Sequence, residues 1–191
     1  MVNRIWAWAC QVGMILLTLV VTYVFDKKTG AIGVNSFNQM GYDELQRNQD
    51  ERGILKSRDY FNTLIKEEID KGIDPSRIVI GGFSQGGAMS LFTGVTNTRK
   101  LGGVFGLSSY LLLSERLKEF CPEGEIPNQN TPFFLAHGIV DDVVKFEFGD
   151  LTQKRLKALG FDVEFHSYPY VFSISLLIPY SPLISLHGMI T

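Results

Sequence analysis

The sequence has few of the residues that build disulfide frameworks or metal sites. Its 191 residues include two cysteines, Cys10 and Cys121, and three histidines, His137, His166 and His187. Two cysteines far apart do not make the disulfide framework of a small secreted domain, so a reduced compartment is the expectation. None of these residues has a spacing typical of a zinc site. We therefore expect no metal and no cofactor.

An excess of positive charge is also lacking. Lysine and arginine number 18 against 20 aspartates and glutamates, which gives a formal net charge of -2. Without a positive field there is no support for binding nucleic acid through its phosphates. The composition, 45% hydrophobic and 20% charged, is typical of a globular protein, and the length suits one domain with a full core.

The first region of the chain is a long apolar run. Residues 5–25 contain no charged side chain. A helix formed by this run would be just long enough to span a bilayer. Three interpretations of this run are open. The first is a membrane anchor, and the second is a buried strand or helix of the domain. The third is sequence that is not part of the folded protein, such as a mispredicted start of the gene. We treat residues 1–30 as a hydrophobic N-terminal segment.

The last region, residues 170–191, is an apolar tail of a different kind. Between 171 and 191 it has no Asp, Glu, Lys or Arg and one histidine, His187, and Pro179 and Pro182 exclude a long helix through it. Its apolar residues follow neither the period of a strand nor that of a helix. We expect both ends to be poorly packed on a central domain that spans residues 36–169.

The central region alternates between helix and strand patterns. The apolar runs and their turn residues predict strands at 77–82, 101–108, 133–136 and 161–167. Amphipathic or small-residue patterns predict helices at 53–71, 86–95 and 146–159, with one or two helical turns at 114–120. This alternation predicts an α/β fold with a mostly parallel sheet covered by helices on both faces.

The turn between the first predicted strand and the next helix carries a nucleophile motif. Residues 82–86, Gly-Phe-Ser-Gln-Gly, fit G-x-S-x-G in a strand-turn-helix setting. The glycines allow strand and helix to close on a sharply turned Ser84, and the backbone N–H of Gln85 can face a developing oxyanion. The alternative is a glycine-rich turn with an idle serine.

A nucleophilic serine needs a base and an orienting acid, in the chain order Ser, acid, His. Asp141 and Asp142 follow the predicted strand 133–136, and either is a candidate acid, with a turn or capping aspartate as the alternative. His137 precedes the acid at a strand end, so we expect a buried structural histidine. His166 alternates with core residues, so we expect it to face outward or to lie under a neighbouring helix, and not to act as the base. Ser84 and the acid should approach one pocket.

Several segments together resemble one enzyme family. GGFSQGGAMSL, the preceding IDPSRIVI, LGGVFGLSSYLL and HGIVDDVV resemble the acyl-protein thioesterases, which belong to the phospholipase/carboxylesterase group of α/β-hydrolases, and most closely the fungal members. The likeness runs from about residue 51 to 169, with a weak start at 36–38. It implies an α/β-hydrolase fold, truncated at both ends, with Ser84 as nucleophile, Asp141 as acid and Gln85 as an oxyanion donor.

The resemblance also implies substrates and a location. Members hydrolyse fatty-acyl thioesters on protein cysteines, and often small esters and lysolipids. S-acylated proteins or acyl-ester lipids would be the partners, in the cytoplasm and also the nucleus. A membrane-anchored location through residues 5–25 is the alternative.

Two features of the family pattern are missing from this sequence. No H-G-x-G-D string precedes Ser84, although that loop supplies the second oxyanion donor in the family. The family histidine corresponds to position 173, which is a serine here, and the likeness stops at Tyr170. His187 is a substitute base in the right chain order. Two functions are thus expected: an impaired serine hydrolase, or a non-catalytic relative or incomplete gene product.

Overall fold

The computed structural model describes residues 15–17 and 41–169. Within these residues lie five strands and four α-helices, and from residue 53 onward strands and helices follow one another in the order that the sequence predicts. In chain order they are β1 (Ile15–Leu17), α3 (Tyr42–Arg47), α4 (Glu51–Asp70), β2 (Ile78–Phe83), α5 (Gln85–Thr96), β3 (Gly103–Leu107), β4 (Phe133–Gly138), α6 (Phe146–Ala158) and β5 (Val163–Tyr168). Short 3-10 turns occur at Pro75–Arg77 and Leu117–Glu119.

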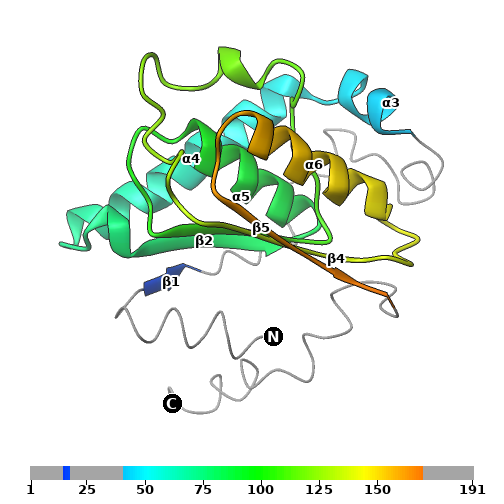
Figure 1. Ribbon diagram of the computed structural model, residues 1–191. Helices are drawn as coiled ribbons and strands as arrows, with labels where there is room; N and C mark the ends of the chain where they lie inside the picture. Colours follow the sequence, from blue (N-terminus) through cyan, green and yellow to red (C-terminus); the bar gives the residue numbers. More distant parts are fainter. Residues whose placement is uncertain (1–14, 18–40, 170–191) are drawn as a thin grey trace, which may run out of the picture.

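The strands form one parallel sheet in the order β1-β2-β3-β4-β5 (Figure 1). Each step along the chain therefore moves one strand across the sheet, with a crossover that contains helix or loop. All strands end at the same edge because all pairs are parallel. That edge is where open α/β sheets place their sites.

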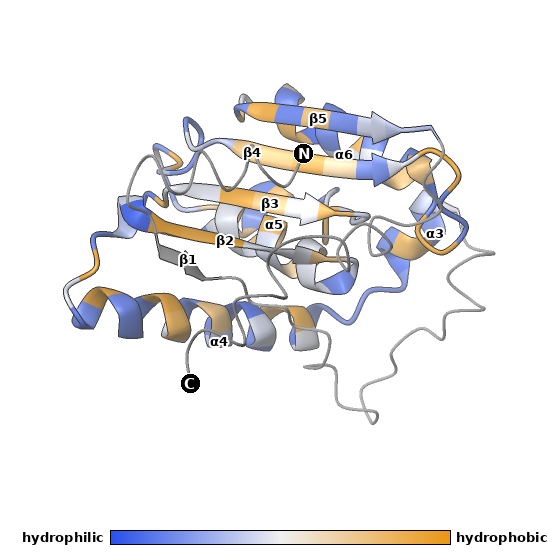
Figure 2. Cartoon of the chain, turned by 90° about the horizontal axis from the view of Figure 1, so that it is seen from below, coloured by the Kyte–Doolittle hydropathy of each residue, from blue (hydrophilic) through white to orange (hydrophobic). Residues whose placement is uncertain are grey.

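The helices that the structure describes all lie on the same face of the sheet (Figures 1 and 2). α5 is buried from Gly86 to Thr96, and it packs against β2, β3 and α4. The expected helical cover is thus confirmed for one face. On the opposite face the described residues place no helix.

α4 begins where a side chain can satisfy its first amide groups. The Asp50 carboxylate accepts a hydrogen bond from the backbone N–H of Gly53, so the helix starts two residues earlier than its apolar pattern predicts. Ile54, Phe61 and Ile65 are its buried residues. Gly72, in the left-handed region at φ 93°, follows its end.

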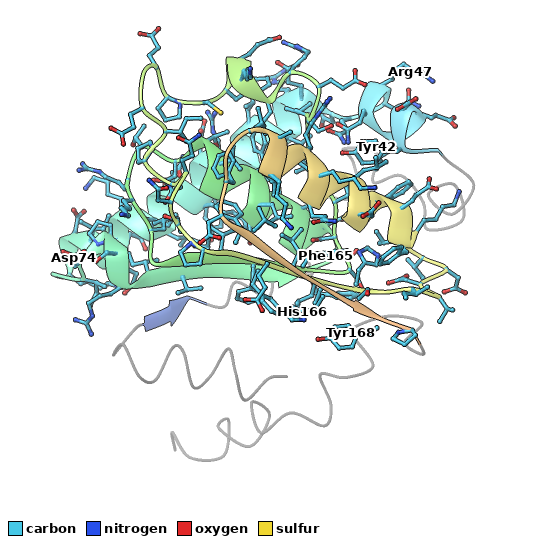
Figure 3. The ribbon with its side chains drawn as sticks, in the orientation of Figure 1. Tyr42, Arg47, Asp74, Phe165, His166 and Tyr168 are labelled. Atoms are coloured by element: carbon cyan, nitrogen blue, oxygen red, sulfur yellow. The ribbon has the colours of Figure 1, made fainter. Side chains whose placement is uncertain are left out.

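The strands differ in how many of their faces are buried. β2 is apolar and buried through five of its six residues, from Ile78 to Gly82, as expected of a central parallel strand. β5 alternates instead. Phe165 stacks on Phe146 of α6, whereas His166 and Tyr168 lie on the opposite side of the sheet (Figure 3).

The N-terminal apolar run contributes one described element. Ile15–Leu17 pairs in parallel with Ile78–Ile80 of β2, so these three residues form a strand. The rest of the predicted segment 1–30 and the predicted tail 170–191 lie outside the described residues. In the described part of the chain, no helix combines the length and hydropathy needed to cross a bilayer.

Candidate active site

Ser84 occupies a strained turn at the end of β2. Its backbone has φ 52° and ψ -122°, a conformation that L-residues rarely adopt. Two hydrogen bonds hold it there: Ser84 N–H donates to the Leu107 carbonyl at 2.9 Å, and Ala88 N–H donates to the Ser84 carbonyl at 2.9 Å. Ser84 is partly exposed, and α5 begins at the next residue, Gln85. A serine between a strand and a helix N-terminus in this conformation is the predicted nucleophile elbow.

Two glycines at the elbow, Gly82 of the motif and Gly87 in the first turn of α5, are required by close contact between strand and helix. A Cβ on Gly82 would lie 2.6 Å from the carbonyl carbon of Gly86. A Cβ on Gly87 would lie 2.7 Å from the Gly82 carbonyl oxygen and 2.8 Å from the Ser109 Cβ. Both spaces are too small for a side-chain carbon. The turn can therefore close on Ser84 only with glycine at these positions.

The end of β3 adds a second strained serine beside the elbow. Ser108 has φ 44° and is fully buried, and its N–H donates to the Ala136 carbonyl of β4 at 2.8 Å. The apolar segment that follows, Tyr110 to Leu113, is buried. No signal in the sequence indicates this turn, because serine has little preference for positive φ.

Asp141 lies in the loop after β4 and is buried, at 6% exposure, whereas Asp142 is exposed. Its Oδ1 accepts hydrogen bonds from the N–H groups of Val143 at 3.0 Å and Val144 at 2.9 Å. Its Oδ2 is also buried and accepts no hydrogen bond from the described residues. A buried carboxylate with one oxygen held and the other open can orient an imidazole.

The sheet brings Ser84 and Asp141 to the same edge. β2 and β4 are both neighbours of β3, so the two strands lie about 10 Å apart at the usual parallel spacing. Each residue follows the carboxyl end of its strand. That separation leaves room for one imidazole ring between a serine and an aspartate.

His137 and His166 do not lie between those two residues. His137 is 1% exposed, and its Nε2 donates to the Val144 carbonyl at 2.7 Å. This confirms the expected buried structural histidine. His166 lies on β5, pairs with Glu164 and stacks on Phe134 at 5.3 Å, on the face of the sheet away from α6 (Figure 3). His187 lies outside the described residues.

The described residues contain no cluster of three or more histidine, cysteine, aspartate or glutamate side chains that could hold a metal ion. The groups that the site prediction places at this edge are the Ser84 hydroxyl and the Asp141 carboxylate.

A comparison with protein families gives a match of residues 28–175 to the family described as Phospholipase/Carboxylesterase. The chain belongs to the phospholipase/carboxylesterase family. This confirms the resemblance noted in the sequence and the α/β-hydrolase fold.

Fungal members of this family are similar over the central region. Acyl-protein thioesterase 1 of Aspergillus fumigatus is 64% identical over 132 residues, which cover 69% of this chain and 54% of that protein. Acyl-protein thioesterase 1 of Emericella nidulans is 62% identical over 133 residues, with coverage of 69% and 55%. The chain thus spans about half the length of the curated relatives it matches.

Solved structures agree with the fold. Arabidopsis thaliana SOBER1 has a TM-score of 0.58 and 32% identity, over 64% of this chain and 57% of that one. Acyl-protein thioesterase 2 of Zea mays has a TM-score of 0.57 at 24% identity, over 74% and 67%. At that identity the maize enzyme supports the fold alone.

Proposed function

We propose that this chain is a serine hydrolase of the acyl-protein thioesterase type, with S-acylated proteins as substrates and small carboxylic esters or lysolipids as further ones. The observation that carries the proposal is the strained conformation of Ser84 at the strand-to-helix turn, with the buried Asp141 carboxylate at the same sheet edge. The names of the fungal relatives support the substrate class.

The proposed reaction follows from these positions. Ser84 Oγ attacks the thioester carbonyl and loses its proton to a base. The backbone N–H of Gln85, at the N-terminus of α5, stabilises the oxyanion. When the C–S bond breaks, the cysteine thiolate takes the proton from the base, and water then hydrolyses the acyl-serine. Asp141 Oδ2 accepts a hydrogen bond from the base and stabilises its charged form.

We propose further that this chain is a poor hydrolase, because its base is not at the family position. The two described histidines bond to other groups, His137 to the Val144 carbonyl and His166 to Glu164, and position 173 is a serine. The second oxyanion donor of the family loop is also missing from the sequence before Ser84, which costs roughly 2.7–4 kcal/mol in the barrier. His187 is the remaining candidate base.

A non-catalytic role is the second candidate function. It is favoured by one observation: the buried Asp141 Oδ2 has no hydrogen-bond partner in the described part of the chain, so the acid holds no base there. As to location, we propose the cytoplasm, with the nucleus as a further site. A membrane-anchored location through residues 5–25 is the alternative.

Covalent labelling of Ser84 by a fluorophosphonate tests the hydrolase proposal. We expect slow labelling of the full chain, none in Ser84→Ala, and faster labelling when imidazole is added as an external base. Hydrolysis of a palmitoyl thioester should likewise be slow in the full chain, absent in Ser84→Ala and faster with added imidazole.

The control variants separate the alternatives. Strong labelling that is lost in His187→Ala would identify His187 as the base and contradict the poor-hydrolase proposal. Labelling that persists in Ser84→Ala, or that is absent even with imidazole, would contradict the hydrolase proposal and favour the non-catalytic one.

A further inference from the structure

His137 and Asp141 hold the same residue, Val144, through its two backbone polar groups. Asp141 Oδ1 accepts the N–H of Val144 at 2.9 Å, and the Val144 carbonyl accepts the Nε2–H of His137 at 2.7 Å. Both side chains are at most 1% exposed. The turn from 141 to 144 is thus fixed by two side chains, one of which also belongs to the proposed site.

The hydrogen bond to Val144 defines the state of the imidazole. A carbonyl only accepts hydrogen bonds, so Nε2 must carry the proton. His137 Nε2 lies 3.9 Å from Asp141 Oδ2, which is too far for a hydrogen bond. The imidazole therefore fixes the turn without occupying Oδ2.

Packing fixes the orientation of the ring. A Cβ on Gly149 of α6 would lie 2.4 Å from His137 Nδ1, so the glycine backbone lies directly against that side of the ring. The Phe146 ring meets the imidazole edge to face at 6.0 Å between centroids. Burial lowers the pKa of His137, which agrees with a neutral ring.

We propose that His137 is a positioning residue of the site: it holds the Val144 carbonyl so that the turn presents Asp141 with Oδ1 occupied and Oδ2 open to the base. The role in catalysis rests on the proposed function. The geometric role does not, because it concerns the turn alone.

Two variants separate the hydrogen bond from the bulk of the side chain. In His137→Gln, the amide Nε2 can still donate to the Val144 carbonyl, whereas His137→Leu removes the donor. We expect hydrogen exchange of the Val143 and Val144 amides to quicken about tenfold in His137→Leu, as for the loss of one buried hydrogen bond. Core amides of β2 should be less affected. The glutamine variant should restore most of the protection.

Labelling of Ser84 in the presence of imidazole gives the functional readout. We expect His137→Leu to lower its rate about tenfold through the misplaced carboxylate, and His137→Gln to recover most of it. Equal rates of exchange in the two variants would overturn the positioning role. So would restored exchange protection without recovery of labelling.

The nitrogen NMR spectrum of the unmodified chain provides a measurement that does not depend on the folding of a variant. We expect a neutral His137 with the proton on Nε2 at pH 7, and the opposite tautomer or a charged ring would overturn the proposal. If Ser84 of the unmodified chain fails to label even with imidazole, the proposed function fails, whereas exchange and tautomer still decide whether His137 holds the turn.

Discussion

Gly82 shows how one residue without a side chain makes the elbow possible. The space where its Cβ would stand is occupied by the backbone of Gly86 and Gly87, at 2.6 and 2.9 Å. Backbone atoms cannot rotate away as the end of a flexible side chain can. A side chain here must therefore push the start of α5 away from β2, and Ser84 lies between the two.

The first prediction is that Gly82→Ala destabilises the fold by about 1–3 kcal/mol, as overpacking of a tight site does. Denaturation by urea measures the change, and fluorophosphonate labelling of Ser84 should fall as well. Gly41→Ala is the control. Gly41 caps α3 with an ordinary φ of -78°, and a Cβ added to it has no heavy atom within 4 Å. Gly41→Ala should therefore lower the free energy of unfolding by less than about 1 kcal/mol. Equal losses in the two variants would contradict the steric account.

The residue pattern alone locates the acid only to within two neighbouring residues, and the family resemblance selects Asp141 of the two. Asp141 and Asp142 have the same chemistry and both follow the predicted strand. The fold separates them: Asp141 is buried with its Oδ1 held by two backbone N–H groups, and Asp142 is exposed. Such a difference depends on how the turn is hydrogen-bonded, which the local sequence does not determine. The catalytic role of Asp141 remains a prediction, as do those of Ser84 and Gln85.

Among the elements, α6 supports the loop that lies beside the elbow. Thr152 is fully buried, and its Oγ1 accepts a hydrogen bond from the backbone N–H of Leu111 at 2.9 Å. Leu111 belongs to the irregular apolar segment after β3, where no strand or helix partner can satisfy that amide. A side chain on a rigid helix satisfies it instead.

The second prediction concerns this contact. Thr152→Val keeps the volume of the side chain but leaves the Leu111 amide buried without a partner, which should cost about 1–3 kcal/mol of unfolding free energy. Hydrogen exchange at Leu111 should quicken at the same time. Thr152→Ser retains the hydroxyl and should keep that amide protected. If both variants lose the protection, the hydrogen bond is not what holds the loop.

The elements that were predicted and those that were missed differ in their source of stability. α4, α5, α6 and the strands β2 to β5 carry their own apolar patterns, and the sequence located them to within about two residues at each end. α3 was not predicted. Six residues with one buried side chain, Leu45, make no periodic signal, and so short a helix is unstable alone. Gln46 fixes it by bonding to the Leu111 carbonyl and the Ser114 N–H.

At the scale of the whole molecule, the parallel sheet creates the site. Ser84 and Asp141 are far apart in the sequence, yet both follow strands that flank β3 and end at one edge. The alternation of strands and helices predicts that both residues lie at this edge, without any knowledge of the loops, and their approach to one pocket stays a prediction. The order of residues along the chain also predicted that His137 is buried and structural, because it precedes the acid at a strand end. It could not predict that His137 and Asp141 bind the two backbone groups of Val144, since those contacts depend on the path of the loop.

The last prediction follows from that buried ring. Burial lowers the pKa of His137 below its ordinary value of 6.5, although the Val144 carbonyl and the nearby Asp141 carboxylate oppose the change. Between the lowered pKa of the folded state and pH 6.5, the unfolded chain therefore binds more protons than the folded chain. Stability rises with pH wherever the unfolded state binds more protons, so this contribution is present above pH 6.5 and is lost as the pH falls.

Urea denaturation at pH 7.5 and pH 5.5 checks the sign and the size. When the pH falls from 7.5 to 5.5, the free energy of unfolding should decrease by up to about 1.4 kcal/mol more in the unmodified chain than in His137→Gln. The reason is that a difference of one bound proton is worth about 1.4 kcal/mol per pH unit. The glutamine variant has the same carboxylates, including Asp141, so the difference between the two proteins isolates the imidazole. An unmodified chain that loses no more than the variant would show that His137 can take up its proton in the folded state. The neutral, Nε2-protonated ring that holds the Val144 carbonyl would then be wrong.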